Sequence, residues 1–236
     1  MEFFEAFWEA VVNFITYCGV LMPELLKGLL TTLKLFAFTI VLSLPLGLFV
    51  SFGRISHFKP LKYVSGFFVW LMRGTPLLLQ LFFVYFALPF VLPVQLDSFG
   101  SALLAFTLNY AAYFAEIFRA GIESIDIGQY EASKALGFGP GSTMRLIIIP
   151  QTIKRVVPPV TNETITLVKD TALVAAIALQ DLLQSAKSAV SRDFDITAYI
   201  LAALIYLILT LVLTFIFKKI EKKFQISDNN ADLLHT

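Results

Sequence analysis

Residues 35–52 decide the fold, and their sequence is LFAFTIVLSLPLGLFVSF, without a single charged residue. A helix needs about 20 predominantly apolar residues to cross a bilayer, and this run approaches that length by itself. Comparable runs follow at residues 64–91, 99–118, 156–179 and 198–217. The sequence therefore predicts an all-α membrane protein with five transmembrane spans.

The overall composition agrees with a chain embedded in lipid. Of the 236 residues, 58% are hydrophobic and 15% are charged, with a net charge of +1, and the mean hydropathy is +0.79. Soluble domains contain about 45–50% apolar residues. No basic cluster lies on a water-soluble surface, which argues against nucleic acid as a partner. The two histidines, His57 and His235, lack metal-ligand spacing, and the only cysteine, Cys18, cannot form an internal disulfide.

Three segments depart from a simple apolar run. Residues 1–22 mix aromatic residues with glutamates and contain no Lys or Arg, so they are expected to form an interfacial helix, with a sixth span as the alternative. The second span is interrupted at residues 73–76. The fourth span is the weakest in hydropathy, and Pro158-Pro159 is expected to break the helix at its start.

Basic residues in the loops predict the orientation. Eleven Lys and Arg residues lie in the loops after the first and third spans and after the fifth span, and four lie in the opposite loops. Cytoplasmic loops carry the Lys/Arg excess, so the N-terminus is predicted outside and the C-terminus inside. We therefore expect a transmembrane domain at residues 23–220, with a long cytoplasmic loop at about 121–151, and a cytoplasmic tail at 221–236.

The long cytoplasmic loop contains the most specific pattern in the chain. Residues 128–136 are expected to form two helical turns that end at Gly137 as the C′ residue. Gly139-Pro140-Gly141 then turns the chain, and Ser142 is expected to cap a second short helix that leads into Ile147–Pro150. An ordinary amphipathic loop helix, without any partner, is the alternative.

The spacing in this loop resembles the cytoplasmic signature of ABC importer permeases. That signature is Glu-Ala-Ala, three residues, Gly, nine residues, Ile, one residue and Leu-Pro, and here Ser133 replaces Ala and Ile149 replaces Leu. In that family the loop forms a coupling helix, which docks in a groove of a separate ATPase. The resemblance implies that an ATPase is contacted by Glu131, Ala132, Ser133 and Gly137, and Glu131 can form a charge-assisted hydrogen bond there.

Three further motifs resemble the polar amino acid branch of this superfamily. They are RGTPLLLQ at residues 73–80, AYFAEIFRAG at 112–121, and Asn162-Glu163 followed by KDTAL at 169–173. The resemblance covers about residues 25–217 and implies the type I ABC importer permease fold in a bacterial inner membrane. It also implies a second permease subunit (the same chain or a paralogue), an extracytoplasmic substrate-binding protein, and an ATPase subunit that binds ATP and Mg.

The fourth span carries polar residues on one side of its helix. At 100° per residue, an arc of about 120° contains Asn162, Glu163, Thr166, Lys169 and Asp170. Ionisable residues at membrane depth mark functional sites, and every free amino acid offers an ammonium and a carboxylate. Glu163 is therefore predicted to bind an ammonium or a cationic side chain, with Asn162, Thr166 and Asp170 beside it.

Gln80 and the helix break at residues 74–76 are predicted to form a second wall of this site, because broken helices near the midplane are common in transporters. Two acids against one lysine on the fourth span favour a cationic amino acid, although glutamine and cystine stay open. A buried structural network of these charges is the alternative. Glu116 and Arg119, three residues apart, are expected to pair with each other for a structural or gating role.

The sequence contains no GxxxxGK[ST] motif and no Ser-His-Asp, paired-Cys or HExxH arrangement. The chain is therefore predicted to be a non-enzymatic permease subunit of an ATP-driven amino acid importer, without a cofactor or metal of its own. Its partners would be the protein subunits above, the amino acid and membrane lipid. A secondary amino acid transporter or channel is the main alternative, because it also needs intramembrane charge, but it has no use for the loop signature. A membrane enzyme would need a catalytic constellation.

Overall fold

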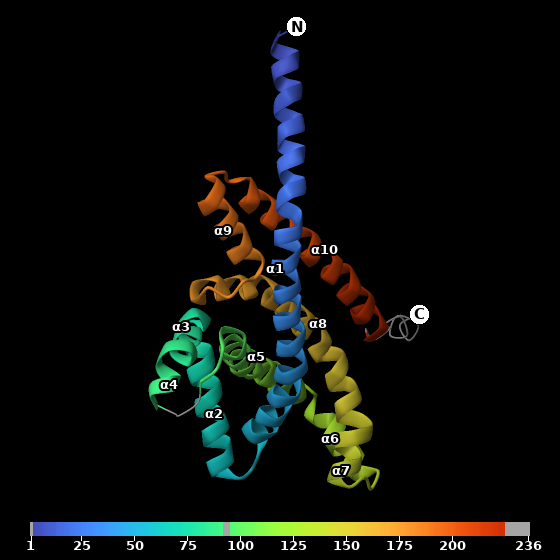
Figure 1. The fold of residues 1–236 in the computed structure, drawn as a ribbon. Helices are drawn as coiled ribbons and strands as arrows, with labels where there is room; N and C mark the ends of the chain where they lie inside the picture. The colour runs from blue at the N-terminus through green and yellow to red at the C-terminus, as the bar shows by residue number, and fades with distance from the viewer. Residues whose placement is uncertain (1, 92–94, 225–236) are drawn as a thin grey trace, which may run out of the picture. The chain divides into compact units, whose positions relative to one another are not determined.

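The computed structural model describes residues 2–91 and 95–224, and every element within them is a helix (Figure 1). The longer elements are α1 (Glu2–Ile55), α2 (Lys59–Gly74), α5 (Ser98–Glu123), α8 (Ile149–Asp170), α9 (Leu182–Asp193) and α10 (Thr197–Phe224). The shorter ones are α3 (Leu77–Phe82), η1 (Phe83–Ala87), α4 (Leu88–Val91), α6 (Ile127–Ala135), α7 (Pro140–Thr143), η2 (Met144–Ile148) and η3 (Thr171–Ile177). The all-α prediction is confirmed.

Four of the five predicted spans coincide with apolar helices in the described part of the chain. α1, α5 and α10 are each long and apolar enough to cross a membrane, and α2 together with the α3–α4 segment provides a fourth span that is interrupted at Thr75 and Pro76. The remaining predicted span begins within α8, which contains five charged residues and is not among these apolar helices. Its α-helix ends at Asp170, where the 3₁₀ helix η3 begins.

The two ends of the chain bear on the predicted domain limits. α1 is continuous from Glu2 to Ile55, so the N-terminal segment is helical but joined directly to the first span, and its interfacial position stays a prediction. α10 continues to Phe224. The rest of the predicted tail, residues 225–236, lies outside the described residues.

The first compact unit consists of Met1–Thr39, Leu77–Phe106 and Leu167–Leu211. Its core lies where α9 and the start of α10 meet α1, at the buried residues Leu21, Leu25, Leu182, Ala186, Ala189, Ala198 and Ala202 (Figure 1). The alanines let the helix backbones approach closely. α9 begins after Asp181, whose carboxylate accepts a 2.8 Å hydrogen bond from the Gln184 N–H, and the Thr32 hydroxyl oxygen accepts one from the Leu182 N–H at 3.2 Å.

The second compact unit consists of Ile40–Pro76, Thr107–Thr166 and Val212–Thr236. In this unit Val69 of α2 packs against Ala112 and Ala115 of α5, and all three are buried. α8 also lies close to α5, because a Cβ atom on Gly121 would come within 2.2 Å of Val156 Cγ1. A glycine is required at that position for the two helices to approach.

The prediction that Pro158-Pro159 breaks the fourth span is wrong. α8 runs through both prolines from Ile149 to Asp170. An interior proline costs a helix about 3 kcal/mol, because it removes a hydrogen bond and clashes with the preceding turn. Here the preceding turns are anchored by the buried residues Thr152 and Val156, which both lie against Gly121. Packing on α5 therefore outweighs the local preference.

The second half of the long loop also differs from the prediction. Gly139 is the N-cap of α7 and Pro140 is its first residue, so Ser142 lies inside the helix and does not cap it. Proline suits the first turn because its missing N–H would have no helical partner there. α7, the π-helical turn η2 and α8 then follow one another without a gap. A continuous helical run therefore joins the loop to α8.

Candidate functional site

The helix α6 lies at the centre of residues 121–151, which are called the α6 loop below. It begins after Asp126, whose carboxylate accepts a 2.7 Å hydrogen bond from the backbone N–H of Gly128. The predicted docking residues that the structure exposes are Glu131, Ala132 and Gly137. Ser133 is buried, and its hydroxyl donates to the Gln129 carbonyl, so this departure from the signature's alanine leaves no polar group unsatisfied.

Gly137 ends α6 as the sequence predicted. Its φ is +81°, in the left-handed region that favours glycine. The Phe138 N–H donates to the Ser133 carbonyl and the Gly137 N–H donates to the Lys134 carbonyl, both at 3.0 Å. These two bonds form a Schellman motif. No atom lies within 4 Å of a Cβ built on Gly137, so backbone conformation alone requires glycine here.

Exposed apolar side chains flank α6. Ile127, its first residue, is 72% exposed, and Leu136, at its C-cap, is 76% exposed. Leu146 in η2 is exposed as well. Ile127 and Leu136 are nine residues apart, which places them on opposite sides of α6 at its two ends. The surface of the α6 loop therefore includes apolar as well as polar side chains.

Two side-chain contacts tie the α6 loop to α8. The Arg155 guanidinium donates to the carbonyl of Ser124 and, at 3.0 Å, to its hydroxyl. Gln151 Nε2 donates to Gln129 Oε1 at 3.1 Å. Sequence reasoning missed both contacts, because each joins residues more than 20 positions apart. Together with the continuous α7–η2–α8 run, they make the loop and the start of α8 one connected piece.

The polar face predicted on the fourth span lies on α8. Its members are exposed or half-buried, namely Asn162, Glu163, Thr166, Lys169 and Asp170, whereas the other side of the helix is buried at Thr164, Leu167 and Val168. The Thr166 hydroxyl donates to the Asn162 carbonyl at 3.2 Å, so its oxygen is left to accept. The structure thus brings four of the five predicted substrate residues onto one helix, and the fifth, Gln80, lies half-buried on α3.

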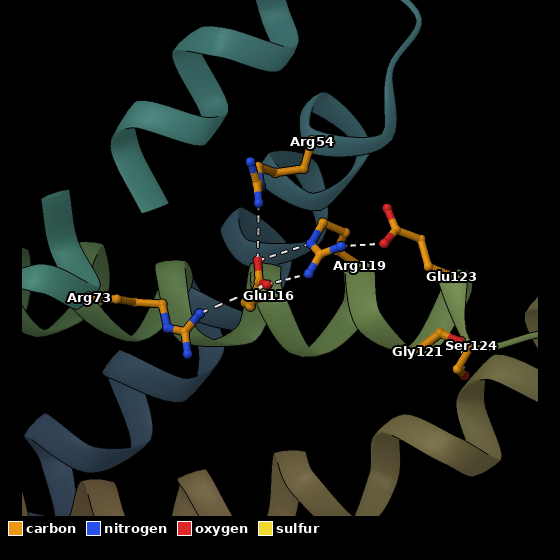
Figure 2. Close-up of polar contacts among 7 residues, drawn as sticks. All are labelled: Arg54, Arg73, Glu116, Arg119, Gly121, Glu123 and Ser124. Atoms are coloured by element: carbon orange, nitrogen blue, oxygen red, sulfur yellow. Dashed lines mark hydrogen bonds and ion pairs between the residues drawn. The ribbon is translucent and has the colours of Figure 1, made fainter. Parts of the chain in front are cut away.

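Glu116 is the centre of a charged cluster that sequence analysis found only in part (Figure 2). Arg119 donates to both carboxylate oxygens of Glu116, from Nε at 3.1 Å and from Nη2, which confirms the predicted pair. Arg119 also pairs with Glu123. Arg54 of α1 and Arg73 of α2 approach the same carboxylate, with N–O distances of 3.5 and 4.0 Å. These five residues are called the Glu116 cluster below.

Glu221 is a further polar residue that sequence reasoning passed over. The Thr161 hydroxyl lies within hydrogen-bond distance of both the Pro158 carbonyl and the Glu221 carboxylate. Glu221 is the one acid among Lys218, Lys219, Lys222 and Lys223. A single acid among four lysines was the sequence feature that could have indicated a specific partner for Glu221. The contact fixes the end of α10 against the buried side of α8.

Comparisons with known proteins place this geometry in context. Residues 43–226 match the family described as binding-protein-dependent transport system inner membrane component. The arginine transport system permease protein ArtQ of Bacillus subtilis (strain 168) is 43% identical over 208 residues, covering 88% of this chain and 95% of that protein. The putative glutamine transport system permease protein GlnP of Rickettsia bellii (strain RML369-C) is 34% identical over 204 residues, covering 86% and 94%.

A solved structure described as an amino acid ABC transporter with histidines contains a chain of the same fold. It superposes with a TM-score of 0.83 at 34% identity, covering 90% of this chain and 97% of that one. The α6 loop, the α8 face and the Glu116 cluster all lie inside the residues that the family description matches. The similarity therefore extends over each of the features described above.

Proposed function

The chain belongs to the binding-protein-dependent transport system inner membrane component family, as an amino acid ABC importer permease, and from this premise we propose how it works. It forms the translocation path for a polar, cationic amino acid. It is driven by a separate ATPase that docks on the α6 loop through Glu131, Ala132, Ser133 and Gly137. The importer is completed by a second permease subunit and an extracytoplasmic binding protein.

The exposed apolar surface of the α6 loop carries this proposal. Ile127 and Leu136 stand exposed at the two ends of α6, and removing such side chains from water stabilises a complex by about 25 cal/mol per Å². The Schellman motif at Gly137 holds the end of α6 in one conformation. Glu131 is exposed between them, where its carboxylate can accept a charge-assisted hydrogen bond.

The amino acid is bound by the polar face of α8 in this proposal. Glu163 accepts hydrogen bonds from the ammonium or the cationic side chain, with Asp170 as a second acid. Asn162 can donate and accept, and Thr166 accepts because its proton is already used in the hydrogen bond to Asn162. Gln80 supplies a second wall. The names of the relatives include both arginine and glutamine, and the two acids on α8 favour the cationic choice.

Energy reaches this site from outside the chain. ATP and Mg are bound by the partner ATPase, which moves the α6 loop between two positions. The α7–η2–α8 run and the Arg155 contact transmit that movement to the face of α8. ATP can shift the importer between two states only if it binds one of these states more tightly than the other. The permease follows that shift only while its α6 loop stays docked on the ATPase. With the Lys/Arg excess inside, the N-terminus faces the binding protein and the C-terminus the cytoplasm.

The test is reconstitution of this chain with its ATPase in proteoliposomes that contain the binding protein. We expect ATP hydrolysis and uptake to rise together when arginine, lysine or histidine is supplied, and to rise less with glutamine. Stimulation by glutamine alone would exclude the cationic specificity but keep the importer. Uptake that needs no ATP would overturn the proposal, because a secondary transporter would then explain the charges on α8.

A further inference from the structure

The turn between α9 and α10, in the first compact unit, holds a bulky residue in an unusual backbone conformation (Figure 1). Phe194, at the end of α9, has a φ of +54°. Bulky residues rarely occupy this left-handed region, because their Cβ atom crowds the following carbonyl oxygen. Helices that end in this conformation usually do so at glycine. The backbone of the turn would therefore form more easily without the Phe194 side chain.

The Phe194 ring gains nothing from the core in return for this strain. It is 94% exposed, and the hydrogen bond from its N–H to the Val190 carbonyl, at 2.9 Å, needs no side chain. Ile196, two residues further, is 66% exposed. An exposed apolar residue is ordinary by itself. A residue that is both exposed and strained points instead to a function of its side chain.

The residues on either side hold Phe194 in place. The Tyr17 hydroxyl of α1 donates to Asp193 Oδ2 at 2.8 Å. Asp195 Oδ1 accepts a 2.7 Å hydrogen bond from the Thr197 N–H, at the start of α10. The turn is thus tied to two helices, and an aromatic ring that is fixed in advance loses little freedom when it binds. Phe194 has the properties of a preorganised aromatic anchor.

Charged groups place this turn in water and not in hydrocarbon, because ionisable residues are costly at membrane depth. They are Glu24, Arg192, Asp193 and Asp195. From the turn, α10 runs as an apolar helix long enough to cross a membrane, and its last turn carries Lys222 and Lys223. The Lys/Arg excess predicts the cytoplasm at that end. The same orientation puts the α9–α10 turn on the extracytoplasmic side.

We propose that Phe194 is an anchor for the extracytoplasmic binding protein. This inference rests on the proposed function, which brings that protein to the same side of the membrane. The ring enters an apolar pocket of the binding protein, with Ile196 at the edge of the contact. Among the described charges around the turn, three carboxylates outnumber one arginine, so the rim of that pocket should be basic. A buried aromatic inside a polar rim is the arrangement in which a few residues carry most of the binding energy.

The importer, reconstituted with its ATPase in nanodiscs, tests this contact. The binding protein, loaded with amino acid, is titrated, and the concentration that gives half-maximal ATP hydrolysis is measured. Phe194→Gly should raise this concentration roughly 30-fold, which corresponds to about 2 kcal/mol. It should not lower the melting temperature, because glycine relieves the strain at this φ. Phe194→Tyr keeps an aromatic ring and should respond like the unaltered chain.

Ala178→Gly is the matched control. Ala178 is the other described non-glycine residue with a positive φ, at +55°, and it is exposed. Glycine therefore relieves the same strain there without removing a ring, and the half-maximal concentration of binding protein should stay unchanged. An equal shift in Ala178→Gly and Phe194→Gly would assign the effect to the backbone and overturn the anchor.

Photo-cross-linking identifies what the ring touches. With p-benzoylphenylalanine in place of Phe194, we expect a cross-link to the binding protein. A cross-link to lipid alone would place the ring at the membrane surface, and one to a second permease copy alone would make the turn a subunit contact. Either result would overturn the proposal.

The titration also separates this inference from the proposed function. An unaltered importer whose ATP hydrolysis does not respond to the binding protein would contradict the proposed function itself. A normal response of the unaltered importer, with the same half-maximal concentration in Phe194→Gly, would overturn the anchor alone.

Discussion

The α6 loop and the polar face of α8 depart from the usual distribution of side chains in opposite directions. α6 exposes Ile127 and Leu136 on a polar segment, whereas α8 carries Glu163 and Asp170 within a chain of apolar spans. Exposed apolar surface favours a protein partner, and intramembrane charge favours a polar solute. The difference predicts two separate sites whose occupants are opposite in chemistry, and variants should separate them.

The largest expected effect is on the α8 side. Glu163→Gln removes the charge but keeps the shape of the side chain. A hydrogen bond to a charged group contributes about 1.5–3 kcal/mol, so the concentration of cationic amino acid for half-maximal uptake should rise roughly 10- to 150-fold. Copurification of the ATPase should stay unchanged.

Thr164→Ser is the control for Glu163→Gln, because it lies on the buried side of the same helix and keeps its hydroxyl. It should leave uptake kinetics as they are. Unchanged kinetics in Glu163→Gln would remove this carboxylate from the substrate site, and loss of the ATPase in that variant would contradict the separation of the two regions.

The second effect is on the loop side. Gly137→Val places a β-branched residue at φ +81°, where the left-handed conformation costs about 1–2 kcal/mol. Loss of the Schellman motif should lower amino-acid-stimulated ATP hydrolysis roughly 5- to 30-fold while amino acid binding to α8 persists. Gly141→Val is the control, because Gly141 has open space and no positive φ. Equal activity of the two variants would show that the end of α6 does not set docking.

A smaller effect is expected where the two regions are joined. Arg155→Gln removes the hydrogen bonds to Ser124, each worth about 0.5–1.5 kcal/mol. Uptake per ATP hydrolysed should fall roughly 2- to 10-fold, while ATPase copurification and amino acid binding remain. Lys154→Gln is the control, because Lys154 is exposed and directly precedes Arg155. A normal ratio in Arg155→Gln would leave the α7–η2–α8 run and the contact between Gln151 and Gln129 as the connections between loop and helix.

Local sequence patterns predicted the parts of both regions that depend on neighbours along the chain. The spacing up to Gly137 predicted the end of α6, and the helical period predicted the α8 face, because capping and helix periodicity are local properties. The break at Pro158-Pro159 was wrong because the contact between Val156 and Gly121 is tertiary. The cap at Ser142 was wrong although Pro140 gave the correct signal for a first helical residue.

Long-range pairing explains what the sequence could not predict. The three-residue spacing of Glu116 and Arg119 predicted their pair. Nothing local indicates that Arg54 and Arg73, from two other helices, reach the same carboxylate. The contact between Arg155 and Ser124 is of the same kind. These groups meet only because α1, α2 and α8 pack on α5.

The smallest effect is expected from a charged group in neither region. Arg192 at the end of α9 pairs with Glu24 at 3.0 Å and donates to Asp193 at 2.8 Å. Exposed ion pairs contribute little, so Arg192→Gln should lower the melting temperature by no more than about 2 °C and leave uptake and ATPase copurification unchanged. An effect on uptake as large as that of Glu163→Gln would show that removing any exposed charge alters transport. The effect of Glu163→Gln would then no longer be specific to the polar face of α8.

The pH dependence of the melting-temperature difference between Arg192→Gln and the unaltered chain identifies the source of that difference. Hydrogen bonds donated by Arg192, and then by Tyr17, lower the pKa of Asp193 to about 2. A carboxylate with a lowered pKa stabilises the fold above its ordinary pKa of about 4 and loses that contribution as the pH falls through 2. The melting temperatures of Arg192→Gln and the unaltered chain should therefore differ most near neutral pH and converge towards pH 2. A difference that persists at pH 2 would assign it to the Arg192 side-chain packing and not to its charge.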